Sequence, residues 1–391
     1  MNTPSVDPVL LLKTLIRCAS VTPETAGVLD MLESALTPLG FKVFRPRFEG
    51  DGSYPVDNLF AIRGSGGKRL LFAGHTDVVP VGDIASWTHP PFAADEVDGV
   101  LFGRGAADMK SGVAAFVSAI AAAIADGTAD QGTIALAITN DEEADAINGT
   151  EKLMAFAAAE GHGFDFAIVG EPSATAKVGD SIKIGRRGSL NAQITVTGTQ
   201  GHVAYPERAN NPLPVVAAIA TALKAAQLDD GTEHFPPSNL EVTSIDVGNT
   251  ATNIIPASGT IRFNIRFNDL WSPDSLAAWI ERQVAGVDAR GCAVAFARMG
   301  RASQSFLSPL DGGIETLCTT IEAATGARPQ LSTGGGTSDA RFIAQYCPVA
   351  EFGLPGPTMH KIDEQVAVSD VHTLAGLYAA FLRAYFTTAQ S

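Results

Sequence analysis

The sequence predicts an α/β protein with a doubly wound, mostly parallel sheet and an inserted second domain. Two observations support this fold class. Short apolar strands alternate with helices, as in strand 69–75 and the alanine-rich helix 111–124. Between residues 189 and 299 the order changes to βαββαβ, which forms a self-contained, two-layer (ferredoxin-like) unit. Because another strand follows this stretch, we expect a main domain of residues 1–186 and 301–391, interrupted by an inserted domain of residues 187–300.

Hydrophobic periodicity predicts the individual elements of both domains. In the main domain we expect helices at 7–17, 26–39, 111–124, 316–324, 338–346 and 371–386, and strands at 41–48, 58–63, 69–75, 132–139, 166–169 and 348–352. In the inserted domain we expect strands at 191–197, 240–247, 260–267 and 292–299, and helices at 212–228 and 273–285. Residues 87–105 are rich in proline, glycine and aromatic side chains, which predicts a long ordered loop.

Composition limits the classes of partner. The chain has 391 residues, 46% of them hydrophobic and 18% charged, which is typical of a folded protein long enough for two domains. Its net charge of −15 argues against nucleic acid or an anionic membrane as a partner. The four cysteines are scattered without a CxxC pair, so we interpret them as buried hydrophobic residues. Residues 1–7 lack the pattern of a signal peptide, and helix 111–124 is too short to span a bilayer, so we expect a cytoplasmic protein.

Imidazole and carboxylate side chains recur where predicted strands end. Each one alone is more simply interpreted as a turn residue, or as a helix cap in the case of Asp108. In a doubly wound sheet, however, the carboxyl ends of the strands meet in one crevice, where ligands bind. The residues concerned are His75, Glu142, Glu143, Glu171 and His360 after strands, and Asp108 before helix 111–124. Together they predict a metal centre, in which Asp77 is placed to accept a hydrogen bond from the second ring nitrogen of His75.

The size of this ligand set indicates two metal ions. Even when Glu142 is not counted as a ligand, two histidines and three carboxylates are too many ligands for one tetrahedral zinc ion. They suit two ions bridged by a carboxylate and a water, and mixed imidazole and carboxylate ligands favour zinc, with cobalt or manganese feasible. A bridging water has a lowered pKa, and a neighbouring carboxylate can take its proton. This arrangement suits the addition of hydroxide to an amide carbonyl.

Several segments resemble the two-zinc aminoacylase/carboxypeptidase-type metallopeptidase family. They are GHTDVVP at 74–80, GRGAADMK at 103–110, DEE at 141–143 and GEP at 170–172. The segments IGRRGS at 184–189, GHVAYP at 201–206, HFPP at 234–237 and TGGGTSD at 333–339 extend the likeness to the branch that removes succinyl groups from diaminopimelate. The resemblance implies hydrolysis of N-succinyl-LL-2,6-diaminopimelate to succinate and LL-2,6-diaminopimelate, in lysine and diaminopimelate biosynthesis. It also implies two zinc ions per subunit, replaceable by cobalt, and a homodimer.

The same resemblance implies a role for each site residue. Asp108 would bridge the two zinc ions, with His75 and Glu171 completing one site and Glu143 and His360 the other. Glu142 would be the general base, and Asp77 would orient His75. His202 would reach the neighbouring subunit's site from the inserted lid and dimerisation domain and stabilise the oxyanion. Substrate-binding residues would be Arg186, Tyr205, Asn253, Arg266, Gly336 and Thr337.

Some alternatives stay open at this stage. A related deacylase, such as acetylornithine deacetylase, shares the metal ligands, and a catalytically silent binding module could use the same fold. The presence of Glu142 argues against the silent module, because pure binding needs no base beside the metals. Ala340 and the loop 354–357 depart from the family pattern, which affects details of the substrate loops. Without the resemblance, His202, Arg186 and Arg187 would be interpreted as ordinary surface residues.

Overall fold

The computed structural model describes residues 5–387 and divides the chain into two units. The first contains the chain up to Ile184, Ser308–Ser332 and the chain from Ser338 onward; the second contains Gly185–Leu307 and Thr333–Thr337. These limits differ from the predicted domain boundaries, chiefly because Thr333–Thr337 belongs to the second unit. There the Thr333 hydroxyl donates to the main-chain carbonyl of His234 at 2.6 Å. The signal-peptide prediction rested partly on residues 1–4, which lie outside the described residues.

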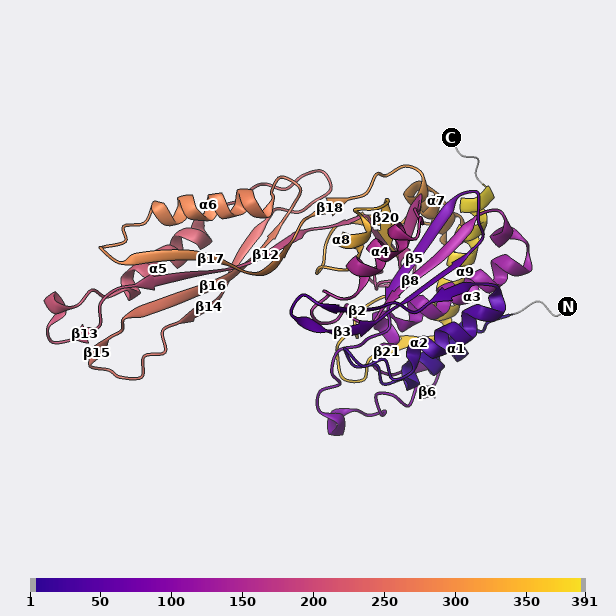
Figure 1. The fold of residues 1–391 in the computed structure, drawn as a ribbon, viewed down its shortest axis with the longest axis horizontal. Coiled ribbons are helices and arrows are strands. Elements are labelled where there is room, and N and C mark those ends of the chain that lie inside the picture. The colour runs from indigo at the N-terminus through magenta and orange to yellow at the C-terminus, as the bar shows by residue number, and fades with distance from the viewer. Residues whose placement is uncertain (1–4, 388–391) are drawn as a thin grey trace. The chain divides into compact units, whose positions relative to one another are not determined.

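The first unit is built on an eight-stranded mixed sheet (Figure 1). Its strands, in spatial order, are β1 (Lys42–Phe44), β4 (Leu59–Arg63), β8 (Thr133–Thr139), β5 (Arg69–His75), β9 (Phe166–Val169), β20 (Val349–Glu351), β10 (Ser181–Lys183) and β19 (Gln330–Ser332). The four central strands β8, β5, β9 and β20 run parallel, whereas β1, β4 and β10 pair antiparallel to their inner neighbours. The predicted α/β fold class is confirmed, with antiparallel pairs toward both edges.

The central strands are buried along almost their whole length, and their interior positions are apolar. Every residue of β8 and of β9 is buried, as are the last six residues of β5. Such uninterrupted apolar runs are typical of parallel strands that are covered on both faces. The polar residues that follow these strands therefore stand at the rim of a rigid, buried sheet.

Two groups of helices accompany the sheet. The helices are α1 (Pro8–Arg17), α2 (Val28–Leu36), α3 (Ser111–Ala125), α4 (Thr150–Ala159), α7 (Gly313–Thr325), α8 (Ala340–Ile343) and α9 (Val368–Thr387). Helices α1, α3, α7 and α9 form one connected layer, and α4 packs with α8. The segment Ala106–Ala125 is long and apolar enough to cross a membrane, but most of it is buried inside the protein, as in a core helix.

Several predicted elements differ from the structure. The predicted strand 41–48 is broken at Pro46, which has no N–H to donate, and residues after it form a hairpin of β2 (Arg47–Gly50) and β3 (Ser53–Asp57). The predicted helix 338–346 shrinks to α8, and helix α4 was not predicted. The predicted loop 87–105 contains β6 (Glu96–Val97) and β7 (Val100–Phe102), and β7 pairs with β21 (Gln365–Ala367).

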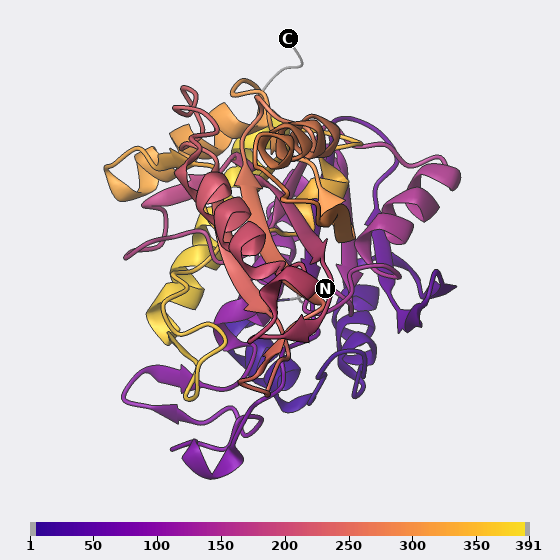
Figure 2. The ribbon, with the colours of Figure 1, turned by 90° about the vertical axis from the view of Figure 1, so that its left-hand side faces the viewer.

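The second unit has the predicted βαββαβ order. Its antiparallel sheet runs β14 (Asn239–Asp246), β16 (Ser258–Phe267), β12 (Gly188–Thr197) and β17 (Ala293–Ser303), with helices α5 (Leu213–Ala225) and α6 (Pro273–Ala285). Alternate residues of β12 are buried with residues of both helices, so the helices cover one face of the sheet (Figure 2). Two short ribbons complete the unit: β13 (Gly201–His202) with β15 (Ile254–Ile255), and β11 (Gly185–Arg186) with β18 (Phe306–Leu307).

Candidate metal centre

The predicted metal ligands gather at the carboxyl ends of the central parallel strands. His75 is the last residue of β5, and the Glu142–Glu143 turn follows β8. Glu171 follows β9, and His360 lies in the loop after β20. Because these four strands are neighbours and run parallel, their carboxyl ends meet at one edge of the sheet.

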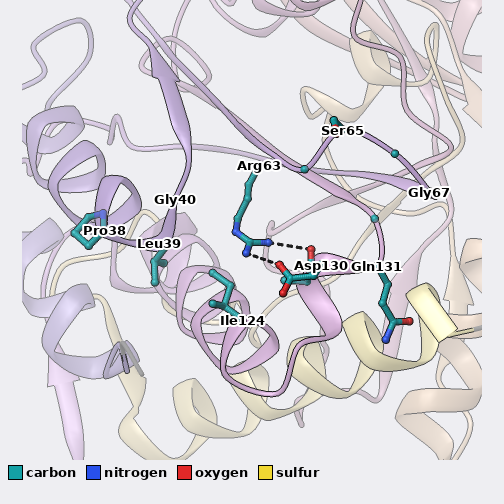
Figure 3. Close-up of a pocket in the computed structure, with 13 residues that line it drawn as sticks. Pro38, Leu39, Gly40, Arg63, Ser65, Gly67, Ile124, Asp130 and Gln131 are labelled. Carbon is teal, nitrogen blue, oxygen red and sulfur yellow. Dashed lines mark hydrogen bonds and ion pairs between the residues drawn. The ribbon is translucent and has the colours of Figure 1, made fainter. Parts of the chain in front are cut away.

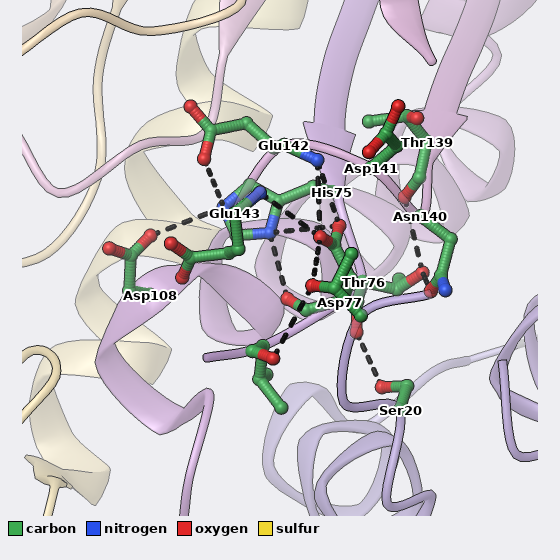
Figure 4. A network of polar contacts seen from close by, with 12 residues as sticks. Ser20, His75, Thr76, Asp77, Asp108, Thr139, Asn140, Asp141, Glu142 and Glu143 are labelled. Atoms are coloured by element: carbon green, nitrogen blue, oxygen red, sulfur yellow. Dashed lines mark hydrogen bonds and ion pairs between the residues drawn. The ribbon is translucent and has the colours of Figure 1, made fainter. Parts of the chain in front are cut away.

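Asp108 lies between the two histidines and faces one with each carboxylate oxygen. Its Oδ1 is 3.3 Å from His75 Nε2 (Figure 4), and its Oδ2 is 3.3 Å from His360 Nε2. Each histidine also has a glutamate of its own: Glu171 Oε1 is 3.3 Å from His75 Nε2, and Glu143 Oε1 is 3.0 Å from His360 Nε2. The arrangement is therefore two half-sites that share one carboxylate. We call His75 and Glu171 the strand-end half-site, and Glu143 and His360 the loop half-site.

Glu142 lies beside the strand-end half-site. Its Oε2 is 4.0 Å from His75 Nε2, farther than the oxygens of Asp108 and Glu171. One ligand atom each from His75, Glu142 and Glu171 falls within 4.8 Å of the others, and the same holds for His75, Asp108 and Glu143. Glu142 is thus close enough to act on a molecule held by the other residues.

The carboxylates are crowded and largely buried, which shifts their acid–base properties. Burial and the charge of Glu171 raise the pKa of Glu142 well above its usual range. Burial and the charge of Asp108 raise the pKa of Glu171 to about 7. Burial acts to lower the pKa of His75, but hydrogen bonds to Asp108 and Glu171 outweigh it and raise that pKa well above 6.5. Hydrogen bonds to Asp108 and Glu143 raise the pKa of His360 to about 10. A set of mixed nitrogen and oxygen donors with this excess of negative charge fits divalent cations.

Asp77 contacts His75 through its main chain rather than as predicted. His75 Nδ1 lies 2.9 Å from the main-chain carbonyl oxygen of Asp77 and 3.6 Å from its carboxylate. The carboxylate accepts instead from the main-chain N–H groups of Glu142 and Glu143, both at 3.1 Å, and from the Thr22 hydroxyl at 2.8 Å. Asp77 therefore joins the end of β5 to the turn that presents both glutamates.

Asp108 does not cap the following helix. Its φ of −122° and ψ of 100° are extended, and α3 begins only at Ser111 without a side-chain cap. The main-chain N–H groups of Ala107 and Asp108 instead donate to Glu364 Oε1, at 2.8 and 3.1 Å. This extended segment leaves both oxygens of Asp108 facing the histidines.

Two buried acids near the centre had no role in the sequence prediction. The carboxylate of Asp141 accepts from the main-chain N–H groups of Ile147 and Asn148, each at 3.0 Å, and from the Tyr54 hydroxyl. It therefore anchors the turn that carries Glu142. Burial raises the pKa of Asp339 to about 6, and the charges of His75 and Asp77 act on it. The DEE and TSD motifs contained both residues, but only the fold reveals their position.

The predicted substrate and lid residues all lie in the second unit, in separate groups. His202, Tyr205 and Asn253 gather at the β13–β15 ribbon: the main-chain N–H of Tyr205 donates to the His202 carbonyl at 2.9 Å, and Val203 donates to Asn253 at 3.1 Å. Arg186 is buried, and its Nη1 donates to the carbonyls of Gly334 at 3.4 Å and Gly336 at 3.0 Å. Thr337 closes the same segment. Within this unit the β13–β15 ribbon and β18 lie at opposite ends (Figure 1).

Arg266 has a neighbour that the prediction left out. It lies on β16 opposite Ser189, and the charge of Arg187, after burial, is what lowers its pKa. Arg187 Nε and Arg266 Nη1 are both shielded from solvent and have no hydrogen-bond partner among the described residues. Two half-buried guanidinium groups with unused donors are suited to an anion.

A hollow of about 820 Å³ lies in the first unit, away from this centre (Figure 3). It is lined by Arg63 at the end of β4, by the glycine-rich loop 64–67 and by residues 129–132 just before β8. This is the opposite edge of the sheet from the metal centre, because β8 ends at Thr139. Arg63 already pairs with Asp130 at 2.6 Å and donates to the carbonyl of Ala129. Among the described residues that line the hollow no unpaired cation is left, and we do not take the hollow as the candidate active site.

Comparison with known proteins agrees with this geometry. A model of peptidase family M20/M25/M40 matches residues 71–384. Succinyl-diaminopimelate desuccinylase of Rhodospirillum rubrum is 51% identical over 391 residues, covering 97% of this chain and 98% of the relative. The enzyme of the same name from Methylorubrum extorquens is also 51% identical, covering 97% of this chain and 99% of the relative.

Solved structures show the same fold at low sequence identity. Aminopeptidase PepT of Bacillus cereus superposes with a TM-score of 0.79 at 19% identity, over 97% of this chain and 99% of that one. The YXEP protein of Bacillus subtilis, described as a dinuclear metal-binding peptidase, gives 0.69 at 13% identity, over 96% of each chain. The metallopeptidase family predicted from the motifs is confirmed: this chain belongs to peptidase family M20/M25/M40.

Proposed function

We propose that this protein hydrolyses the amide bond of N-succinyl-LL-2,6-diaminopimelate, giving succinate and LL-2,6-diaminopimelate for lysine and diaminopimelate biosynthesis. The observation that carries the reaction type is Asp108, whose two oxygens face two histidines while Glu142 lies alongside. The substrate is supported by the two desuccinylases that are 51% identical over nearly their whole length. The pathway would place the enzyme in the cytoplasm.

The centre would hold two zinc ions, which cobalt could replace. His75 and Glu171 would hold one ion, Glu143 and His360 the other, and Asp108 would bridge them. When bound, the ions would lower the pKa of a water molecule between them and polarise the amide carbonyl.

Glu142 would act as the general base. Its carboxylate is largely buried, and burial together with the charge of Glu171 raises its pKa well above its usual range, which makes it a stronger base. The carboxylate oxygens would take a proton from the attacking water and return it to the leaving nitrogen. Asp77 would hold the base in place, because its carboxylate binds the main-chain N–H of Glu142.

The second unit would recognise the substrate's carboxylates. Arg186, Gly336 and Thr337 would bind one end of the molecule, with the guanidinium group of Arg186 held by two main-chain carbonyls. Arg266 would bind another carboxylate, and the unused donors of Arg266 and Arg187 support this. A succinyl substrate offers an extra carboxylate that an acetyl substrate lacks, and unpaired buried donors penalise the smaller ligand.

The active form would be a homodimer in which the second unit serves as lid and dimerisation domain. His202, Tyr205 and Asn253 are exposed on the β13–β15 ribbon. They would complete the partner subunit's active site, where His202 would donate to the oxyanion and Tyr205 and Asn253 would contact the substrate.

The direct test compares two substrates before and after chelation. We expect kcat/KM to be far higher for N-succinyl-LL-2,6-diaminopimelate than for acetylornithine, and activity to vanish on chelation and return with zinc or cobalt. Equal efficiency on both substrates would move the assignment to a general deacylase. Full activity in a verified metal-free sample would contradict the proposed metal centre.

A further inference from the structure

A buried ion pair lies directly behind the loop half-site. Arg104 Nη1 and Glu364 Oε2 are 2.7 Å apart, and their side chains are 3% and 0% exposed. Burying two charges costs free energy that their attraction offsets only when the remaining donors and acceptors are also satisfied. The further contacts of both side chains therefore indicate what the pair holds in place.

Glu364 holds the main chain at Asp108. Its second oxygen, Oε1, accepts from the N–H groups of both Ala107 and Asp108, while its main-chain carbonyl accepts from Gly103 at 2.8 Å. These bonds fix the segment in which Asp108 has extended φ and ψ angles and presents both of its carboxylate oxygens. Two N–H donors on one carboxylate oxygen constrain both the position and the direction of this segment.

Arg104 holds the loop that carries His360. Its Nη1 also donates to the main-chain carbonyl of Lys361 at 3.1 Å, one residue after His360. Its guanidinium group stacks over Trp87, with 5.2 Å from Cζ to the ring centre. The side chain of His360 is 47% exposed, so packing does little to fix it. Its φ of +61° is one that a non-glycine residue rarely adopts, so the surrounding loop must hold it.

The two half-sites are thus supported differently. His75 ends β5 and Glu171 follows β9, so the sheet itself positions the strand-end half-site. The separation between Asp108 Oδ2 and His360 Nε2 depends on two loop segments that the sheet does not hold. The Arg104–Glu364 pair is bonded to both of these segments.

We propose that the Arg104–Glu364 pair is a positioning device that sets the metal affinity of the loop half-site. This inference rests on the proposed function only in that the half-site must bind a metal ion. Neither residue touches the reacting atoms. Their loss should weaken the ion of the loop half-site, bound second, the most. The ion of the strand-end half-site shares only Asp108 with the displaced segments and should weaken much less.

The test is zinc binding by purified protein, measured by equilibrium dialysis and by the absorption spectrum of the cobalt form. We expect two zinc ions per wild-type chain. Glu364→Gln keeps an acceptor oxygen but removes the charge, and should weaken the second ion about 10–100-fold, as changes behind metal ligands commonly do. Arg104→Lys should have a similar effect, because an ammonium group loses the stacking over Trp87 that orients the Nη1 contacts to Glu364 and Lys361.

A double variant separates a loss of metal affinity from a failure to fold. A single substitution leaves one charge buried without its partner, whereas Arg104→Met/Glu364→Leu removes both charges together, which proteins often tolerate. Melting of the metal-free proteins reports folding, and the double variant should show the same selective loss. Asp130→Asn is the matched control, because it makes the same acid-to-amide change in the Arg63 ion pair at the opposite edge of the sheet and should leave both zinc affinities unchanged.

The outcomes separate this proposal from the proposed function. Equal weakening of both ions, or wild-type affinity at both sites in every variant that folds, would overturn the positioning role. If wild-type protein itself binds fewer than two ions, the proposed metal centre fails instead.

Discussion

The candidate metal centre of the first unit and the proposed recognition residues of the second are organised in contrasting ways. His75 and Asp108 are buried and stand within hydrogen-bond distance of one another at the rim of a parallel sheet. Tyr205 is 51% exposed and follows the short strand β13, and the segment that contacts Arg186 returns from a distant part of the chain. The sheet can preorganise the chemistry within one unit, whereas the exposure of the ribbon is what the proposed contact with a second subunit requires.

The largest effect should come from the base in the preorganised region. Glu142→Gln should lower kcat about 10²–10⁴-fold, because the amide keeps the shape of the side chain but cannot take a proton. Elemental analysis should still find the wild-type metal content. Loss of metal together with activity would mean that Glu142 is a metal ligand and belongs to one of the half-sites.

Removing the imidazole of His202, on the exposed β13–β15 ribbon, should lower kcat by a smaller factor. His202→Ala should lower kcat about 10²–10³-fold, the usual cost of one oxyanion donor. Metal content and melting temperature should not change, because His202 is exposed and its ring accepts a local hydrogen bond, from the N–H of Ala204 at 3.1 Å.

Mixed dimers test whether His202 acts across subunits. Glu142→Gln and His202→Ala chains are unfolded together and refolded, so that some dimers contain one of each. If His202 serves the neighbouring site, one site of a mixed dimer has both defects and the other has neither, and activity partly returns. Mixed dimers that form but remain as inactive as their components would place His202 in its own chain's site.

Substitutions at the neighbouring arginines Arg187 and Arg266 should change substrate binding more than turnover. Arg187→Met should raise KM for the succinyl substrate about 10-fold with little change in kcat, since a hydrogen bond to a charged group is worth about 1.5–3 kcal/mol. The control is Arg262→Met on the same strand as Arg266, since Arg262 pairs on the surface with Gln193 at 3.1 Å. An equal rise in KM for both variants would show that Arg187 contributes only to the overall positive charge of the surface and does not bind the substrate directly.

The sequence predicted the parts of this site that local pattern determines. His75, Glu142, Glu143 and Glu171 follow apolar strands, and parallel strands bring such residues together whatever the details of packing. The contact between Glu364 and Ala107 spans 257 positions, and no spacing rule signals it. Whether Asp77 meets His75 with its carboxylate or its carbonyl depends on a single turn, which hydrophobic periodicity does not resolve. The return of Thr333–Thr337 to the second unit likewise depends on tertiary hydrogen bonds.

The smallest effect, a pH dependence of stability, should be confined to the crowded centre. In metal-free protein the folded-state pKa of Glu171, about 7, lies above its ordinary 4.5, so its stabilising contribution is present below pH 4.5 and is lost as the pH rises through 7. His360, raised to about 10, contributes fully below pH 6.5 and loses this contribution as the pH rises toward 10. Both groups therefore destabilise the metal-free protein as the pH rises from 5 to 8.

Two other shifted groups fall outside that interval. The pKa of Asp108 is lowered by its two histidines despite burial, so its contribution changes only in acid, below its ordinary 3.8. Burial lowers the pKa of Lys110 to about 8, and its contribution changes above that pH. We therefore expect the melting temperature of metal-free protein to fall between pH 5 and pH 8, and saturating zinc to raise it more at pH 8, where fewer protons compete for the ligands. Glu171→Gln should flatten the metal-free slope, whereas Asp126→Asn, which changes an exposed acid paired with Arg383, should not. A slope that is unchanged in Glu171→Gln would mean that the charge crowding at this centre does not govern its stability.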